Sequence, residues 1–224
     1  MNLNKALGYC SMYVDNHTDR KELGFIHASN GYAQASDKTS IIWCKLDKPT
    51  EDVWPVVRKF ELEDVKPVDW WKSFPDPRGS EMVSINLSCL DGLEKSFKAW
   101  INAFSIVKKN FKTDCALLKC SENGLDLFAS GNVYPTQGLF YRLCECAGPD
   151  AEFWCNPEFW IRACKVLADL NPQAIEICIA EKGIVDIFAG DVRIKFCPII
   201  KGEEHNPEAW KFYKSGGMYI DPEA

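Results

Sequence analysis

The sequence predicts an α+β protein built from repeated units, each a helix followed by three antiparallel strands. Two observations lead to this prediction. A strand–turn–strand pattern occurs three times along the 224 residues, and a stretch with helical periodicity precedes each occurrence. The composition, 46% hydrophobic and 26% charged, is that of an ordinary globular protein, and the chain is long enough to bury one large core or two smaller ones. We therefore expect a folded chain rather than a disordered one.

Each strand–turn–strand segment is predicted to be a β-hairpin. The first two turns contain Asn30-Gly31 and Asn123-Gly124, and Asn-Gly pairs readily take the positive φ angles of a tight turn. The third turn is placed at Gly183, and the second and third hairpins share the pattern Asp-[Leu/Ile]-Phe-Ala. A third strand is expected after each hairpin, over residues 41–46, 139–146 and 192–199.

The helix before the second hairpin has the clearest pattern. Its apolar residues follow the spacing of one helical face and are expected to be buried: Leu93, Phe97, Trp100, Ile101, Phe104 and Val107. The opposite face carries a continuous polar stripe that must face water or an anion: Lys95, Lys98, Asn102, Ser105 and Lys109.

The other two helices follow the same design. For the third helix, Asn156 is the expected cap and Pro157 the first helical residue. Its inward residues are Trp160, Ala163, Cys164 and Leu167, and its outward residues are Glu158, Arg162, Lys165 and Asp169. The first helix is shorter, with Lys5 as its only cation and a predicted buried side of Leu3, Ala6, Leu7 and Cys10.

Leading strands over residues 82–87 and 151–155 extend the pattern to a βαβββ unit. Residues 48–77 contain a short helical pattern around 52–60 and no hairpin signal, so they are either a decayed fourth unit or a covering linker. We predict an incomplete domain over residues 1–78, a complete domain of two units over residues 79–202, and a C-terminal tail over residues 203–224.

Charge is unevenly distributed along the chain. The formal net charge of −6 argues against electrostatic binding of nucleic acid by the whole surface. Residues 92–113, however, contain five lysines and one glutamate. The protein is therefore acidic with at least one basic element, the second helix.

The βαβββ unit, repeated about every 60 residues and carrying helices with a basic outward face, resembles the DNA sliding clamps: the bacterial β subunit and the proliferating-cell-nuclear-antigen type. The resemblance covers residues 83–200 well and residues 1–46 partly. It implies a clamp-like fold with antiparallel sheets outside and helices on one face. It also implies a ring-shaped homo-oligomer around duplex DNA, of phage or bacterial origin, acting without catalysis as a polymerase processivity factor or another replication-associated clamp.

Two functional sites follow from this resemblance. The cations expected to face DNA are Lys95, Lys98, Lys109, Arg162 and Lys165, with Lys5 and Lys108 as additions. Polymerase or loader peptides are expected near Ser130, Gly131 and Asn132, where bacterial members often have Ala-Thr-Asp-Gly. The first repeat has Ala35-Ser36-Asp37 at the matching place.

Alternatives remain open for both sites. The lysines are also what a solvated helix surface would carry, and the residues near Ser130 are also ordinary turn residues. A clamp-fold module that binds other proteins and never encircles DNA is the alternative function. Two placements stay open for the tail: over the predicted peptide site near Ser130, or in an intersubunit sheet.

Enzymatic, metal-binding and membrane functions have little support. Eleven cysteines include no Cys-x-x-Cys pair, and there are only three histidines, so we expect no zinc site, no other metal and no cofactor. The cysteines, Cys164 and Cys197 among them, are interpreted as reduced core residues. Glycine-rich phosphate loops are missing, and no surrounding motif supports a cysteine nucleophile beside His27 or His205. Without a bilayer-length apolar stretch or a secretory signal, we expect the protein in the cytoplasm.

Overall fold

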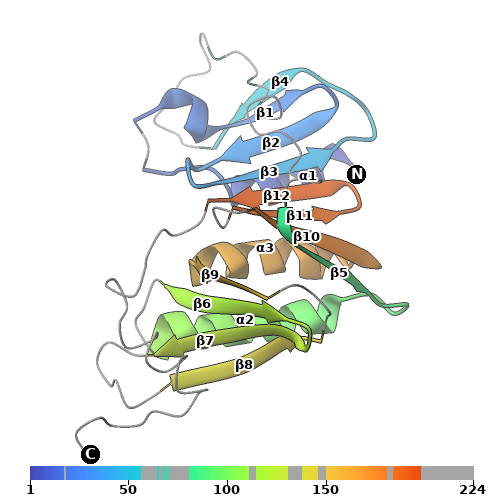
Figure 1. Ribbon diagram of the computed structural model, residues 1–224. Helices are drawn as coiled ribbons and strands as arrows, with labels where there is room; N and C mark the ends of the chain where they lie inside the picture. The colour runs from blue at the N-terminus through green and yellow to red at the C-terminus, as the bar shows by residue number, and fades with distance from the viewer. Residues whose placement is uncertain are drawn as a thin grey trace, which may run out of the picture. The chain divides into compact units, whose positions relative to one another are not determined.

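The computed structural model has a mixed α+β fold (Figure 1). It describes residues 1–17, 19–56, 65, 68, 70, 81–110, 115–130, 138–145, 150–180 and 184–197. Contacts divide the chain into two compact units, one of residues 1–79 with 186–197 and one of residues 80–185 with 198–224. No helix in the described part of the chain combines the length and the apolar character needed to cross a bilayer.

The second unit contains one whole repeat interlocked with the first three elements of the next. Its elements in chain order are β5 (Glu81–Ser88), α2 (Glu94–Asn110), β6 (Ala116–Ser121), β7 (Gly124–Ser130), β8 (Gly138–Cys144), β9 (Ala151–Cys155), α3 (Pro157–Leu170) and β10 (Ala174–Ala180). A leading strand precedes each helix, as the sequence predicts. Each leading strand pairs antiparallel with the first strand after the other helix, β5 with β10 and β9 with β6. Strands β8, β7, β6 and β9 form a sheet in that order.

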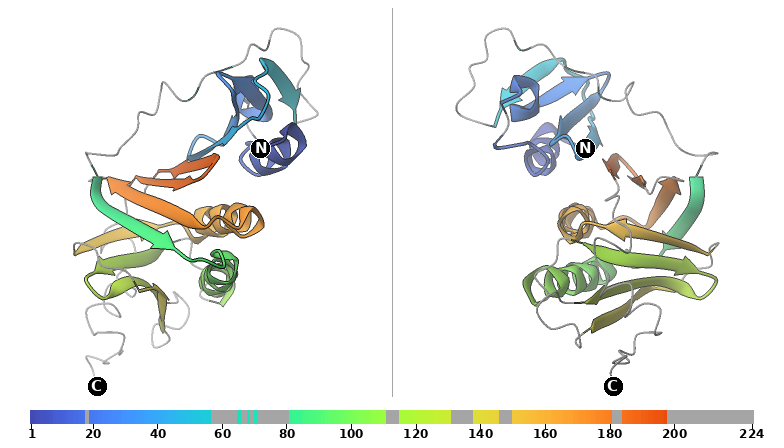
Figure 2. Two further views of the ribbon diagram at one scale, coloured as in Figure 1. Left: turned by 90° about the vertical axis from the view of Figure 1, so that its right-hand side faces the viewer. Right: turned by 60° about the vertical axis from the view of Figure 1, so that its left-hand side comes forward.

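Helices α2 and α3 run antiparallel beside each other. The Lys108 ammonium near the end of α2 pairs with Glu158 at the start of α3. At the other end, the backbone N–H of Glu94 donates to Asn171 Oδ1, 3.3 Å away, just after α3. Figure 2 shows both helices on the same side of the strands of this unit. Their outward faces therefore point to the same side.

The buried faces of these helices agree with the predicted apolar patterns. Trp160 packs between the helices, with its ring 6.1 Å from that of Trp100 and stacked on that of Phe104 at 5.6 Å between centroids. The Trp100 Nε1–H donates to the Leu143 carbonyl oxygen at 2.7 Å, which fixes α2 to β8. One expectation was wrong in part: Ile101 is only half-buried, and Ala103 takes the buried position beside it.

In the residues that the structure describes, the first unit contains one α-helix and a sheet. Its elements are α1 (Leu3–Ser11), the 3-10 turn η1 (Lys21–Gly24), β1 (Phe25–Ser29), β2 (Tyr32–Ser36), β3 (Ser40–Lys45), β4 (Asp52–Pro55), β11 (Val185–Ala189) and β12 (Val192–Phe196). The strands follow the order β4, β1, β2, β3, β12, β11. The segment of residues 186–197 groups with residues 1–79 because β12 pairs with β3 along its whole length. The predicted boundaries place this segment in the domain of residues 79–202, and those boundaries stay a prediction.

Two expectations for the first unit were wrong. In α1 the buried residues are Ala6, Tyr9 and Cys10, whereas Leu3 is 37% exposed. Helix α1 packs on β2 and β3 through the side that carries Tyr9, which turns Leu3 away. Residues 52–55 form a strand instead of the start of a short helix, because β1 offers a free edge and Val53 and Trp54 favour extended backbone.

Strand β4 occupies the place of a leading strand. The order β4, β1, β2, β3 in the first unit matches the order β9, β6, β7, β8 in the second, and β9 is the strand that begins the next repeat. Strand β4 thus begins a further repeat whose helix and hairpin do not follow in the described residues. This favours the interpretation of residues 48–77 as the remnant of a fourth repeat.

The first two hairpin turns use glycine in different ways. Asn30 and Gly31 have φ of 51° and 81°, so the expected tight turn is confirmed. In the second hairpin, Gly124 has φ of 145° and is already the first residue of β7. Asn123 is not among the described residues with positive φ, so that expectation was wrong.

Gly124 is needed because a Cβ there would clash with the Cys144 carbonyl oxygen. Gly183, the third predicted turn residue, lies outside the described residues.

The thiols divide into core and surface groups. All cysteines of the described chain are free. Cys164 is fully buried, as predicted, and burial raises the pKa of its thiol. Cys197 is exposed, so its interpretation as a core residue was wrong. It directly follows β12, whose five residues are all buried, at the point where the strand ends.

Candidate nucleic-acid interface

The outward face of α2 carries the predicted polar stripe. Lys95, Lys98, Asn102 and Lys109 are exposed, and Ser105 is half-buried. They lie away from the apolar side that packs on α3 and on the strands. Six of the seven cations assigned to DNA lie on α2 and α3. The seventh, Lys5, is exposed on α1 in the first unit, with Nζ 5.5 Å from the centre of the Tyr9 ring.

Two of these lysines have carboxylate partners. Lys98 pairs with Glu94 one turn earlier on α2, and Lys108 pairs with Glu158 of α3. All four side chains are 44–63% exposed, so water screens both pairs and each contributes less than about 1 kcal/mol. A phosphate group can therefore replace either carboxylate at low cost.

Three other lysines are open to solvent. Lys95, Lys109 and Lys165 are exposed, and none of them forms an ion pair within the part of the chain that the structure describes. Arg162 is half-buried, with its guanidinium carbon 5.6 Å from the centre of the Phe159 ring. Its planar group is thus held along the helix surface. The most available positive charge on these helices belongs to the three open lysines.

The basic character of this face comes mainly from α2. Helix α2 carries four lysines and one glutamate, whereas α3 carries two cations and two acids, Glu158 and Asp169. Sequence analysis did not assign a role to either carboxylate partner. The Glu94–Lys98 pair is visible in the sequence as an i, i+4 spacing. The Lys108–Glu158 pair has no such signal in the sequence, because 50 residues separate its two members.

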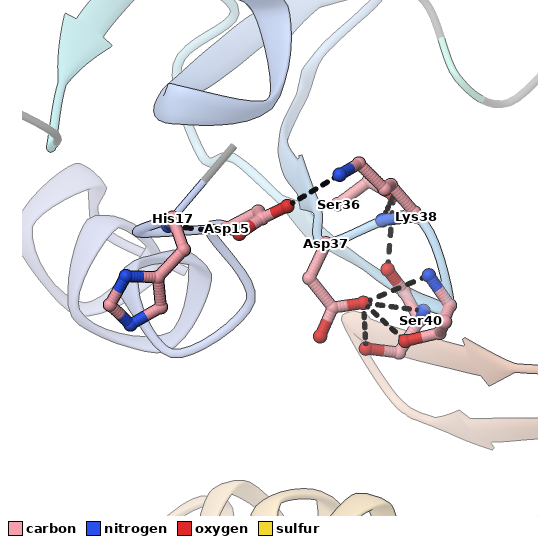
Figure 3. Close-up of polar contacts among 7 residues, drawn as sticks. Asp15, His17, Ser36, Asp37, Lys38 and Ser40 are labelled. Atoms are coloured by element: carbon pink, nitrogen blue, oxygen red, sulfur yellow. Dashed lines mark hydrogen bonds and ion pairs between the residues drawn. The ribbon is translucent and has the colours of Figure 1, made fainter. Parts of the chain in front are cut away.

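The predicted partner-binding site is only partly described. Ser130 is the last residue of β7 and pairs with Gly138 of β8. Gly131 and Asn132 lie outside the described residues. In the first repeat the matching residues form a tight turn between β2 and β3 (Figure 3). There Asp37 Oδ1 accepts hydrogen bonds from the backbone N–H of Ser40 at 2.7 Å and from its hydroxyl at 2.8 Å, so Asp37 stabilises the turn itself.

Comparison with known proteins identifies the fold. No protein-family model matches the chain, and no curated protein is similar to it in sequence. Solved structures do match: the DNA polymerase III β subunit of Borrelia burgdorferi with a TM-score of 0.65 at 12% identity, a DNA polymerase sliding clamp of Pseudomonas aeruginosa with 0.67 at 13%, and the β subunit of Thermotoga maritima with 0.64 at 11%. The fold is that of a DNA sliding clamp.

The sliding-clamp resemblance seen in the sequence is confirmed at the level of fold. The matches cover 88–89% of this chain and 62–64% of those three chains, so this chain spans less than two thirds of their length. At 11–13% identity the clamp similarity establishes the fold alone. The helix-and-strand repeats of this chain take the arrangement of that fold. Whether their helices hold DNA is a matter of their own surface chemistry.

Proposed function

We propose that this protein is a sliding-clamp-like processivity factor, or another replication-associated clamp, that holds duplex DNA without reading its sequence. The contact is made by the outward faces of α2 and α3, and no catalytic step is involved. The observation that carries the proposal is the row of exposed lysines on α2, in a clamp fold whose net charge is otherwise negative.

The residue types on this face suit a contact that must slide. A sliding tether needs exchangeable attraction to phosphates, because a base-specific contact would hold it in one place. Lysine is a point charge on a flexible stem and adapts to a moving phosphate, whereas arginine favours a fixed two-pronged geometry. Five of the six cations assigned to DNA on α2 and α3 are lysines.

The ion pairs show which of these cations can meet a phosphate most freely. Lys95, Lys109 and Lys165 can meet phosphate directly. Lys98 and Lys108 must first release the carboxylate with which each is paired. Arg162 and Lys5 lie against aromatic rings and contribute less freely. We expect the open lysines to supply most of the salt-sensitive affinity.

The same proposal includes partners. A clamp must assemble into an oligomer to encircle DNA, and we propose a homo-oligomer. Polymerase or loader peptides are proposed to bind near Ser130, Gly131 and Asn132. The alternative is a clamp-fold module that binds proteins and never encircles DNA. The single repeat of the first unit favours this alternative, because a closed ring needs complementary edges in every subunit.

Charge reversal at the open lysines tests the DNA contact. The Lys95→Glu/Lys109→Glu variant should bind duplex DNA more weakly, and the slope of log affinity against log salt should fall by about two, since each lost phosphate contact removes about 0.9. The Lys45→Glu/Lys48→Glu variant makes the same charge change at exposed residues of the first unit and should keep the slope. Equal slopes in wild type and both variants would contradict the DNA contact and favour the protein-binding alternative.

A further inference from the structure

The side chain of His27 is buried inside the first unit, and its hydrogen bonds fix its tautomer. His27 lies on β1 with none of its surface exposed. Its Nδ1 accepts a hydrogen bond from the backbone N–H of Val68 at 3.2 Å, and its Nε2 lies 2.7 Å from the carbonyl oxygen of Glu22. A backbone N–H can only donate and a carbonyl oxygen can only accept. The ring therefore carries its proton on Nε2 and is neutral.

Gln34 holds the same short segment from the neighbouring strand. It lies on β2 directly opposite His27 and is 1% exposed. Its Nε2 donates to the Val68 carbonyl oxygen at 2.8 Å, and its Oε1 accepts from the Trp70 backbone N–H at 3.0 Å. The Trp70 ring packs edge-on against the His27 ring, with centroids 6.2 Å apart. Two side chains of the sheet thus satisfy three main-chain groups that lie 34 to 41 residues further along the chain.

Protonation of His27 is incompatible with these contacts. An imidazolium ring donates from both nitrogens, so a proton on Nδ1 would point at the Val68 N–H, donor against donor. The Val68 N–H would lose its acceptor, and a positive charge would be buried beside it. The protonated ring can be accommodated only if Val68 moves away from β1.

The elements around β1 carry their carboxylates elsewhere. Asp52 of β4 is exposed and pairs with Ala28, so its side chain lies on the opposite face of the sheet from His27. Tyr32 of β2 lies on the same face as His27, one residue pair further along, and offers no carboxylate. A charge on His27 would therefore form in buried surroundings. The other charged side chains on the elements that pack on β1 are exposed or half-buried: Lys5 of α1, and Lys21 and Glu22 of η1.

We propose that His27 is a pH-sensitive latch, which holds Val68 and Trp70 on β1 and β2 while its ring is neutral and releases them when the ring is protonated. An ordinary histidine titrates near about pH 6.5. The latch is fully stable above that pH and weakens as the pH falls, because the released state binds the proton and the latched state does not. The ratio of released to latched molecules should rise by up to about tenfold for each pH unit below about 6.5. The latch lies within the first unit and does not depend on DNA binding.

Hydrogen exchange of the Val68 and Trp70 amides, followed by NMR on the full chain, tests the latch. After correction for the intrinsic exchange rate, the protection of both amides should be constant above about pH 7. It should fall by up to about tenfold per unit between about pH 6 and pH 5. The Leu46 amide, which donates to the Gly31 carbonyl oxygen at 2.8 Å, is the control and should keep its protection. Constant protection of Val68 across this range, or an equal loss at Leu46, would overturn the proposal.

Two variants separate the titrating ring from the rest of the contact. His27→Asn places an amide oxygen near the position of Nδ1 without a titrating group, and should remove the pH dependence of Val68 protection. His17→Asn removes an exposed histidine of the same unit and should keep that dependence. A pH dependence that persists in His27→Asn, or that disappears in His17→Asn, would contradict the role of His27.

The wild-type ring decides should circular dichroism show the His27→Asn variant unfolded. Imidazole nitrogen NMR should show the Nε2–H tautomer of His27 at about pH 7.5, and protonation of the ring over the same pH range in which the Val68 amide loses protection. An Nδ1–H tautomer, or a ring that stays neutral while Val68 loses protection, would overturn the proposal.

Discussion

The Asp15 carboxylate links the stability of the first unit to pH. Burial is the largest single influence and would raise the pKa of Asp15, but the His17 backbone N–H and the Lys38 ammonium at 3.1 Å together hold that pKa below its usual value. A carboxylate with a lowered pKa in the folded chain adds stability above its unfolded pKa, and this stability is lost as pH falls through the folded pKa.

Asp15→Asn should therefore cost little and remove part of the acid sensitivity. At pH 7 the expected loss is at most about 1 kcal/mol, because water screens the pair. The difference between wild type and variant should begin to shrink near about pH 4 and should vanish only once the pH is below the lowered folded pKa of Asp15. Urea unfolding at several pH values measures both effects. A difference that stays constant down to pH 2 would contradict the assignment.

Replacing either of two hairpin-turn glycines by alanine should lower the free energy of unfolding, by different amounts. Gly31→Ala places a Cβ in open space at φ of 81° and should cost about 1–2 kcal/mol. Gly124→Ala adds a clash with the Cys144 carbonyl oxygen and the Arg142 side chain, and should cost about 1–3 kcal/mol more. Denaturant unfolding of both variants tests the difference. Equal costs would mean that β8 can move away from Gly124.

At the scale of elements, the contact between α2 and α3 controls one charge of the proposed DNA contact, that of Lys108. Glu158→Gln should release Lys108 and raise both the affinity for duplex DNA and the salt slope, the slope by up to about one. Glu152→Gln on β9 makes the same change of net charge away from the helices and should have a smaller effect. Fluorescence anisotropy across a salt series measures both variants. A larger effect of Glu152→Gln would contradict a contact at α2 and α3.

The elements differ in how far the sequence predicts them. Helix α2 and the Asn30-Gly31 turn are set by local spacing, so the periodicity of Phe97, Trp100 and Phe104 suffices to find the buried face. Leu3 and Ile101 were wrongly predicted to be buried, because burial at the flank of a helix depends on what packs beside it. The Lys108–Glu158 pair and the strand at residues 52–55 depend on contacts between distant segments, and a local pattern contains no signal for such contacts.

At the scale of the whole molecule, the repeat explains both the fold and the main departure from larger clamps. The second unit contains one complete repeat and the first three elements of the next, whose last two strands, β11 and β12, group with the first unit. In its described residues the first unit also has α1 with its three strands and the leading strand β4.

Retention on circular against linear DNA tests whether this protein encircles and slides on a duplex. The wild-type protein is assembled on a nicked circular plasmid, washed at moderate salt, and then compared with a sample in which the plasmid has been cut once. We expect the protein to stay on the circle and to be lost from the linear DNA by sliding off its ends. Equal retention on both forms, or none on the circle by a protein that is an oligomer in solution, would contradict it.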